Sequence, residues 1–255
     1  MKLLVLLVVC LFGIHSAFAT DQIFITKSFD LDKVIFDGKW SFYTEWKKSS
    51  WNPLTYDNGT TIIDLRTAHQ GNFIYVFVDD VKTTQWSSGK DKATICFDTN
   101  DTKNTVANAS DYCFQTILSG TEPITLQGDS TSPSNFKTIS NPDGFIGVAS
   151  ISDVNDRYTD VPHPGYEFRI PTDTIGRSAD YGFYVSVYHS QSNKTYSWPQ
   201  DISTSASEIP SPSKWGELIS PDKSLPEFPV PAITLLGSII VVIYFSRNVI
   251  FKRFA

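Results

Sequence analysis

Short runs of β-branched and aromatic residues, separated by turn-rich stretches, fill the middle of this 255-residue chain. The clearest example is 61–67, then a turn at 70–72, then 73–78, which is typical of two strands joined by a tight turn. Val, Ile, Tyr, Phe and Thr favour strands because they suit a pleated, half-buried surface. Further runs cover 94–97, 112–118, 124–126, 145–151, 166–170 and 181–188. Without amphipathic helices between them, they predict an all-β fold, an antiparallel β-sandwich of the immunoglobulin or jelly-roll kind.

The first 19 residues have the three parts of a secretory signal peptide. Lys2 gives a basic start, 3–14 is an apolar run, and Ala17-Phe18-Ala19 is a small-x-small cleavage site. We expect 1–19 to be removed; the alternative is an uncleaved anchor, for which the run is short.

A second apolar segment lies near the C-terminal end. Residues 230–245 carry no charge, and basic residues follow them. This pattern predicts a transmembrane helix over 230–250 and a basic cytoplasmic tail over 251–255; a buried core helix is the alternative. The prolines within 209–229 predict an extended linker that follows a folded domain at 20–208. We therefore expect the domain at the extracellular face of the cell membrane.

Charge and motifs exclude several function classes. The chain has 27 acidic and 21 basic residues, a formal net charge of −6, so it is a poor partner for nucleic acid. It lacks the G-x-S-x-G, H-E-x-x-H and P-loop motifs. Glu45 and Glu167 could in principle act as an acid–base pair, but nothing in the sequence places them together. We expect no enzyme.

The cysteines point to one disulfide. Cys10 belongs to the signal peptide, which leaves Cys96 and Cys113 in two strand-like runs of an exported domain. We expect them to form a disulfide; a zinc site is the weaker alternative, because two thiols without nearby histidines are too few ligands.

Two features concern the surface loops. Four N-x-S/T sequons predict exposed asparagines that could carry glycans: Asn58, Asn100, Asn108 and Asn193. The loop from Asp98 offers hard oxygen ligands, so Asp98, Asn100 and Asp111 are candidate calcium ligands. Lys103 opposes a cation there, and a solvated polar loop is the alternative.

Several segments, in order, resemble one superfamily. They are 35–40 with Glu45-Trp46, the hairpin 68–80, the strand 93–98, the strand 166–171 and the closing segments 181–185, 196–199 and 213–216. Together they resemble DOMON-like domains and family 9 carbohydrate-binding modules over 29–218. The resemblance implies a β-sandwich whose relatives bind sugars, haem or no known ligand.

The resemblance also suggests where a sugar would bind. A pyranose stacks its apolar face on an aromatic ring, and family 9 modules hold a sugar between two tryptophans. Trp40 and Trp46 fall in the opening motif, so we assign them to the core. Trp86, in a polar loop after Asp80, and Trp198, beside Tyr196, are the candidate pair. Asp80 and Tyr196 would supply hydrogen bonds; packing inside the domain is the alternative for either indole.

The tail has its own resemblance. Pro226-Glu227-Phe228, the apolar run and the basic end resemble the PEF-CTERM sorting signals of archaeal surface proteins, which implies processing by an archaeosortase. Pro229 stands where the common form has glycine, so a retained membrane anchor is the alternative.

The resulting prediction is a non-catalytic, membrane-tethered module that binds a glycan or cell-envelope polysaccharide. A haem-binding electron-transfer subunit is one alternative. Its usual methionine ligand is missing, since Met1 is the only methionine, and His69, His163 and His189 lie on separate segments. A structural envelope protein without a small ligand is the other alternative.

Overall fold

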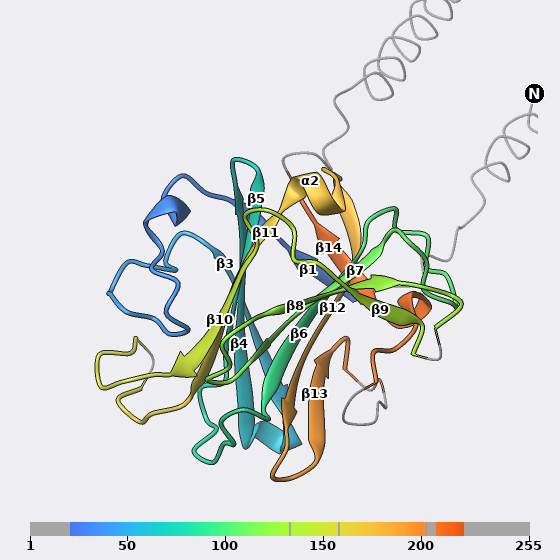
Figure 1. Cartoon of the computed structure of the whole chain (residues 1–255). Helices are drawn as coiled ribbons and strands as arrows, with labels where there is room; N and C mark the ends of the chain where they lie inside the picture. The colour runs from blue at the N-terminus through green and yellow to red at the C-terminus, as the bar shows by residue number, and fades with distance from the viewer. Residues whose placement is uncertain (1–20, 133, 158, 201, 203–207, 222–255) are drawn as a thin grey trace, which may run out of the picture.

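The computed structural model describes residues 21–132, 134–157, 159–200, 202 and 208–221, which form two β-sheets packed face to face (Figure 1). The larger, eight-stranded sheet has the order β1-β14-β12-β6-β7-β8-β9, with β13 also pairing to β12. Its strands are β1 (Gln22–Phe24), β14 (Gly216–Ile219), β12 (Asp180–His189), β6 (Lys92–Asp98), β7 (Asp111–Ile117), β8 (Ile124–Gly128), β9 (Phe136–Ile139) and β13 (Lys194–Trp198).

The smaller, six-stranded sheet has the order β10-β11-β5-β4-β2, with β3 also pairing to β4. Its strands are β10 (Ile146–Ile151), β11 (Pro164–Pro171), β5 (Phe73–Asp79), β4 (Thr61–Gln70), β2 (Thr26–Lys27) and β3 (Ser50–Tyr56). Single helical turns occur at η1 (Leu31–Lys33), η2 (Asp57–Gly59), α2 (Thr172–Ile175) and η3 (Pro212–Lys214).

The predicted all-β sandwich is confirmed, but a purely antiparallel arrangement is wrong. β1 pairs with β14 in parallel, and β2 pairs with β4 in parallel. Both sheets are therefore mixed. The segments near the N-terminus add strands to existing edges, which needs no hairpin turn and leaves the pairing direction free.

The main core lies between the sheets and follows the period of two along each strand. Alternate residues of β5 and of β12 point into it, and both sets are almost fully buried. They are Ile74, Val76 and Val78 from the smaller sheet, and Phe183, Val185 and Val187 from the larger sheet.

A third layer covers the outer face of the smaller sheet. The segment 28–49, blue at the left of Figure 1, places Trp40 and Trp46 against Phe77. Both indoles are buried, which confirms their assignment to a core. Gly38 has a φ of +83° and lies so close to Ser150 that a side chain would collide with its backbone. Glycine is therefore required where this layer meets the sheet.

The sheet extends beyond the predicted domain boundary. β14 hydrogen-bonds with β12 and β1, and the indole of Trp215 beside it is buried. The expected linker at 209–229 is therefore wrong for 209–219, where the buried Pro212 begins a helical turn directly before the strand.

The two apolar ends lie outside the described residues. These ends are the predicted signal peptide at 1–19 and the predicted transmembrane helix at 230–250. Within the described ranges, no helix is long and apolar enough to cross a membrane.

The predicted disulfide is confirmed. Cys96 and Cys113 are opposite each other in the β6–β7 pair and are joined by an S–S bond, buried on the outer face of the larger sheet. The cross-link joins residues 17 positions apart.

We expect the double replacement Cys96→Ala, Cys113→Ala to lower the free energy of unfolding by about 3 kcal/mol, because the open chain regains loop entropy. Urea denaturation of the oxidised protein and the variant measures this difference. Reduced wild-type protein separates the effect of the cross-link from the effect of lost sulfur packing. A difference below about 1 kcal/mol between oxidised and reduced wild type would contradict the prediction.

Candidate functional site

Three connections meet at one end of the sandwich, the lower end in Figure 1. They are the η2 turn between β3 and β4, the long 80–91 loop between β5 and β6, and the 190–193 turn between β12 and β13. This end is opposite to α2. Turns and a long loop supported on a rigid sheet are a common setting for a binding site.

The buried carboxylate of Asp80 holds the start of the long loop. Asp80 is fully buried, and its Oδ1 accepts a hydrogen bond from Thr83 Oγ1 at 2.8 Å. Its Oδ2 lies 2.6 Å from His189 Nε2, at the end of β12. Asp80 therefore connects the loop to the opposite sheet, which fixes the position of both.

A second buried carboxylate, that of Asp91, holds the end of the same loop. Its Oδ2 accepts from the backbone N–H of Ser87 at 2.8 Å. Its Oδ1 accepts from the backbone N–H of Ser190 at 2.8 Å and from the Ser190 hydroxyl at 2.7 Å. One side chain thus fastens the 80–91 loop to the 190–193 turn.

We expect Asp91→Ala to release this connection. Three donors lose a buried acceptor, so amide hydrogen exchange at Ser87 and Ser190 is expected to accelerate by at least about tenfold. Hydrogen exchange followed by NMR measures the change, with Asp143→Ala at an exposed turn as the control. Unchanged exchange at both serines in Asp91→Ala would show that the carboxylate does not hold the loop.

Between the fastened loop and turn lies a polar groove of about 360 Å³. It is lined by Thr83, Thr84, Gln85, His189, Gln191 and Ser192. Trp86 follows the lining residue Gln85, is half-buried, and packs against the main core. The Gln191 side chain donates to the Trp86 backbone oxygen at 2.8 Å. The groove therefore combines hydroxyl, amide and imidazole groups, and Trp86 follows one of its lining residues along the chain.

A second groove adjoins it on the side of η2. Tyr196 lies between the two, because its ring contacts His189 at 5.0 Å and Tyr56 at 5.2 Å between centroids. Its hydroxyl donates to Asp57 Oδ2 at 2.8 Å. Lys194 and this hydroxyl hold the pKa of the Asp57 carboxyl below its usual range. Aromatic edges and an ion pair therefore line this groove.

Three of the four residues predicted to contact a ligand come together at this end. Asp80 supports the groove, Trp86 accepts a hydrogen bond from the lining residue Gln191 through its backbone oxygen, and Tyr196 separates the groove from its neighbour. Trp198 lies on the same strand as Tyr196 but is only 7% exposed. Its ring packs 5.9 Å from that of Phe183 and fills the space above Gly216. A ring buried in this way offers no free face, so Trp86 is the candidate indole that can reach a ligand here.

The candidate calcium ligands lie at the opposite end. Asp98 and Asp111 are register partners in β6 and β7 and are both buried, whereas Asn100 is exposed. Asp98 accepts from the backbone N–H of Lys103 at 2.8 Å and of Asn100 at 3.3 Å. Burial and the nearby Asp98 raise the pKa of Asp111 to about 7. The loop is closed by its own donors, as in the solvated-loop alternative, and calcium binding stays a prediction.

The sequons lie on turns and loops. Asn58, Asn100 and Asn193 are exposed, and Asn108 is half-buried with its side-chain oxygen accepting from Ser110. Asn58 and Asn193 both lie at the end that carries the two grooves.

Sequence reasoning missed Asp91 and Gln191 and considered His189 only as a haem ligand. In the structure His189 and His163 are each paired with a buried aspartate, Asp80 and Asp79. A usable signal existed for Asp91, which directly precedes a strand and follows a long polar loop. None existed for Gln191, which is an ordinary turn residue by sequence.

Comparison with solved structures relates this fold to sugar-binding proteins. A family 9 carbohydrate-binding module from Caldicellulosiruptor kristjanssonii, solved in complex with cellotriose, aligns with a TM-score of 0.50 and 14% identity. The alignment covers 82% of this chain and all of that one. The same kind of module in complex with glucose gives a TM-score of 0.49 and 16% identity. No family model and no curated protein matches the sequence. At this identity the likeness concerns the fold.

Proposed function

We propose that this chain is a non-catalytic carbohydrate-binding module and that its site is the groove beside Trp86. The proposal rests on the end of the sandwich at which hydrogen bonds hold the 80–91 loop and the 190–193 turn together. Two buried aspartates, Asp80 and Asp91, hold a polar groove in place next to a partly exposed indole. Sugar recognition needs this combination, because the ring stacks on an aromatic face while fixed polar groups bind its hydroxyls.

The fold likeness supports the choice of sugar class. The two similar modules are described in complex with cellotriose and glucose, so short β-glucans are the first ligands to test. We assign stacking to Trp86 and hydroxyl recognition to Gln191, Gln85 and the threonines of the groove.

Two observations favour binding over catalysis. Glu45 belongs to the third layer and Glu167 lies on β11 beneath it; both are buried, and neither lines the groove. Glu45 accepts from the backbone N–H groups of Ile35 and Ser41 at 2.8 and 2.6 Å. Glu167 is likewise occupied by donors from the same layer. An acid–base pair would need access to a substrate, which these two side chains do not have.

We extend the proposal to an exported protein that is tethered to the membrane by its C-terminal apolar segment, retained or processed by an archaeosortase. The support is the signal-like start, the apolar run at 230–245 and the internal disulfide, which is typical of oxidising compartments.

Isothermal titration of the purified protein with cellotriose, with and without calcium, tests the proposal. We expect saturable binding with one site per chain. A glycan array screened in parallel identifies a different sugar if cellotriose is not the ligand. Urea denaturation, which measures the stability that the disulfide contributes, shows that the protein is folded. If the folded protein binds neither cellotriose nor any sugar of the array, the proposed function is contradicted.

A further inference from the structure

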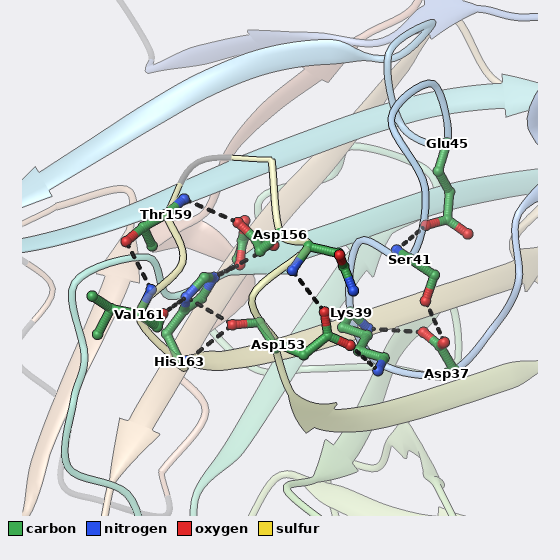
Figure 2. A network of polar contacts seen from close by, with 12 residues as sticks. Asp37, Lys39, Ser41, Glu45, Asp153, Asp156, Thr159, Val161 and His163 are labelled. Atoms are coloured by element: carbon green, nitrogen blue, oxygen red, sulfur yellow. Dashed lines mark hydrogen bonds and ion pairs between the residues drawn. The ribbon is translucent and has the colours of Figure 1, made fainter.

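A separate buried cluster lies between the end of β5 and the loop that leads from β10 to β11. His163 is fully buried, and its Nε2 lies 2.8 Å from Asp79 Oδ1 and 3.8 Å from Asp156 Oδ2. Figure 2 shows His163 and Asp156 with the loop residues that surround them. Within the part of the chain that the structure describes, this is the one group of three His, Cys, Asp or Glu side chains whose ligand atoms all lie within 4.8 Å of one another.

The orientation of the His163 ring is fixed by its other nitrogen. Nδ1 lies 2.8 Å from the backbone oxygen of Val161, and a carbonyl oxygen can only accept. Nδ1 therefore carries a hydrogen, and Nε2 is the nitrogen that faces the two carboxylates. Metal-binding histidines have this arrangement, because the second N–H is usually donated to a carbonyl or carboxylate that orients the ring.

One carboxylate oxygen in the cluster has no partner. Asp79 is 1% exposed, and its Oδ2 has no hydrogen-bond partner among the described residues. A buried acceptor without a donor is costly, and such groups require an explanation. Asp64, the register partner of Asp79, adds a third carboxylate nearby. The three carboxylates lie close enough to disfavour each other's charged form, an effect that either a proton on Nε2 or a bound cation would offset.

We propose that Asp79, Asp156 and His163 bind a first-row divalent transition metal ion, with Zn²⁺ as the representative. An imidazole nitrogen with two carboxylates suits such ions better than Ca²⁺, which prefers oxygen ligands throughout. Tetrahedral zinc sites with bonds of 2.0–2.1 Å place their ligand atoms about 3.3 Å apart. The distances from His163 Nε2 to the two carboxylate oxygens, 2.8 Å and 3.8 Å, reach this value with small side-chain movements. The ion takes the place of the Nε2 proton and binds the free oxygen of Asp79.

The position of the cluster indicates a structural role. An ion here would join the 152–163 loop to the last residue of β5. Asp79 directly precedes Asp80, which supports the groove at the same end of the sandwich. The two consecutive aspartates point to opposite faces of the strand, so one would hold the metal while the other holds the loop.

The experiment uses the full chain, stripped of metal by dialysis against a chelator and then titrated with Zn²⁺ alone. We expect one tightly bound ion per chain, counted by elemental analysis after gel filtration, and a thermal midpoint that rises with zinc concentration. Asp79→Asn and His163→Gln are each expected to weaken zinc binding by at least about tenfold. His69→Gln, which removes a half-buried histidine at the other end, is expected to leave it unchanged.

Either variant could also unfold, so a measurement on wild-type protein accompanies them. Long-range ¹H–¹⁵N NMR reports the state of the His163 ring. We expect both ring nitrogens to carry hydrogen in the stripped protein and Nε2 to lose its hydrogen when zinc is added. The proposal is overturned if Asp79→Asn and His163→Gln both bind zinc as tightly as His69→Gln does. It is also overturned if the His163 ring keeps both hydrogens at saturating zinc. The cluster would then be a protonated histidine between carboxylates.

Discussion

Glu167→Ala is expected to lower the free energy of unfolding by about 4 kcal/mol, because it removes the acceptor of two buried donors and one half-buried donor. The carboxylate of Glu167 is fully buried on β11. Its Oε2 accepts from the backbone N–H groups of Asp37 and Gly38 at 2.9 and 2.7 Å, and its Oε1 accepts from the Trp46 indole at 2.9 Å. Each donor left unpaired in a buried position costs about 1–3 kcal/mol.

Chemical denaturation of the variant and the wild type measures this loss. Glu122→Ala is the matched control, since Glu122 is exposed, and surface substitutions of this kind usually change stability by less than about 0.5 kcal/mol. Because the three donors belong to the segment 28–49, that segment is expected to lose protection from proteolysis first. A loss below about 1 kcal/mol, or a loss equal to that of the control, would show that Glu167 does not anchor the third layer.

Trp86→Ala is expected to lower the affinity for a bound β-glucan by at least about tenfold, equivalent to about 1.4 kcal/mol. Trp86 directly follows the groove-lining residue Gln85, and truncation removes the indole on which we propose that a sugar ring stacks. The Gln191 bond is made to the Trp86 backbone oxygen, so the replacement leaves the loop connection intact. Titration calorimetry compares the dissociation constants of variant and wild type.

Trp51→Ala is the matched control for this experiment. Trp51 is 54% exposed on β3 and donates its indole N–H to Asp64, on the outer face of the smaller sheet and away from the groove. It tests whether any exposed indole binds sugar. Equal losses in the two variants, or a loss in Trp51→Ala alone, would move the binding site to that face.

The main strands could be predicted from the sequence because their signal is local. β4 and β5 alternate around a glycine turn, and the predicted runs match both of them. β3 was missed because Pro53 cannot donate to a strand ladder. It is tolerated since β3 pairs only with β4 and lies at an edge of the sheet. β1 and β14 are too short to give a periodic pattern and depend on each other for pairing.

The site was harder to predict because its parts are distant in sequence. Asp80 and His189 are 109 residues apart, and Asp91 and Ser190 are 99 apart, yet these pairs build the groove. The sequence also does not distinguish the half-buried Trp86 from the buried Trp198. Whether an indole is buried depends on its neighbours across the sheet, and Gly216 is the neighbour that makes room for Trp198.

The most direct test of the central claim is an NMR titration that follows the six tryptophan indole N–H signals while cellotriose, or the best ligand of the glycan array, is added. The indoles of Trp40, Trp46 and Trp215 are buried, with their N–H groups bonded inside the protein. We expect the Trp86 signal to shift in a saturable manner, together with the side-chain amide of Gln191, while these three stay in place. A titration in which Trp51 shifts and Trp86 does not, or in which no indole responds to any ligand, would contradict a sugar site in this groove.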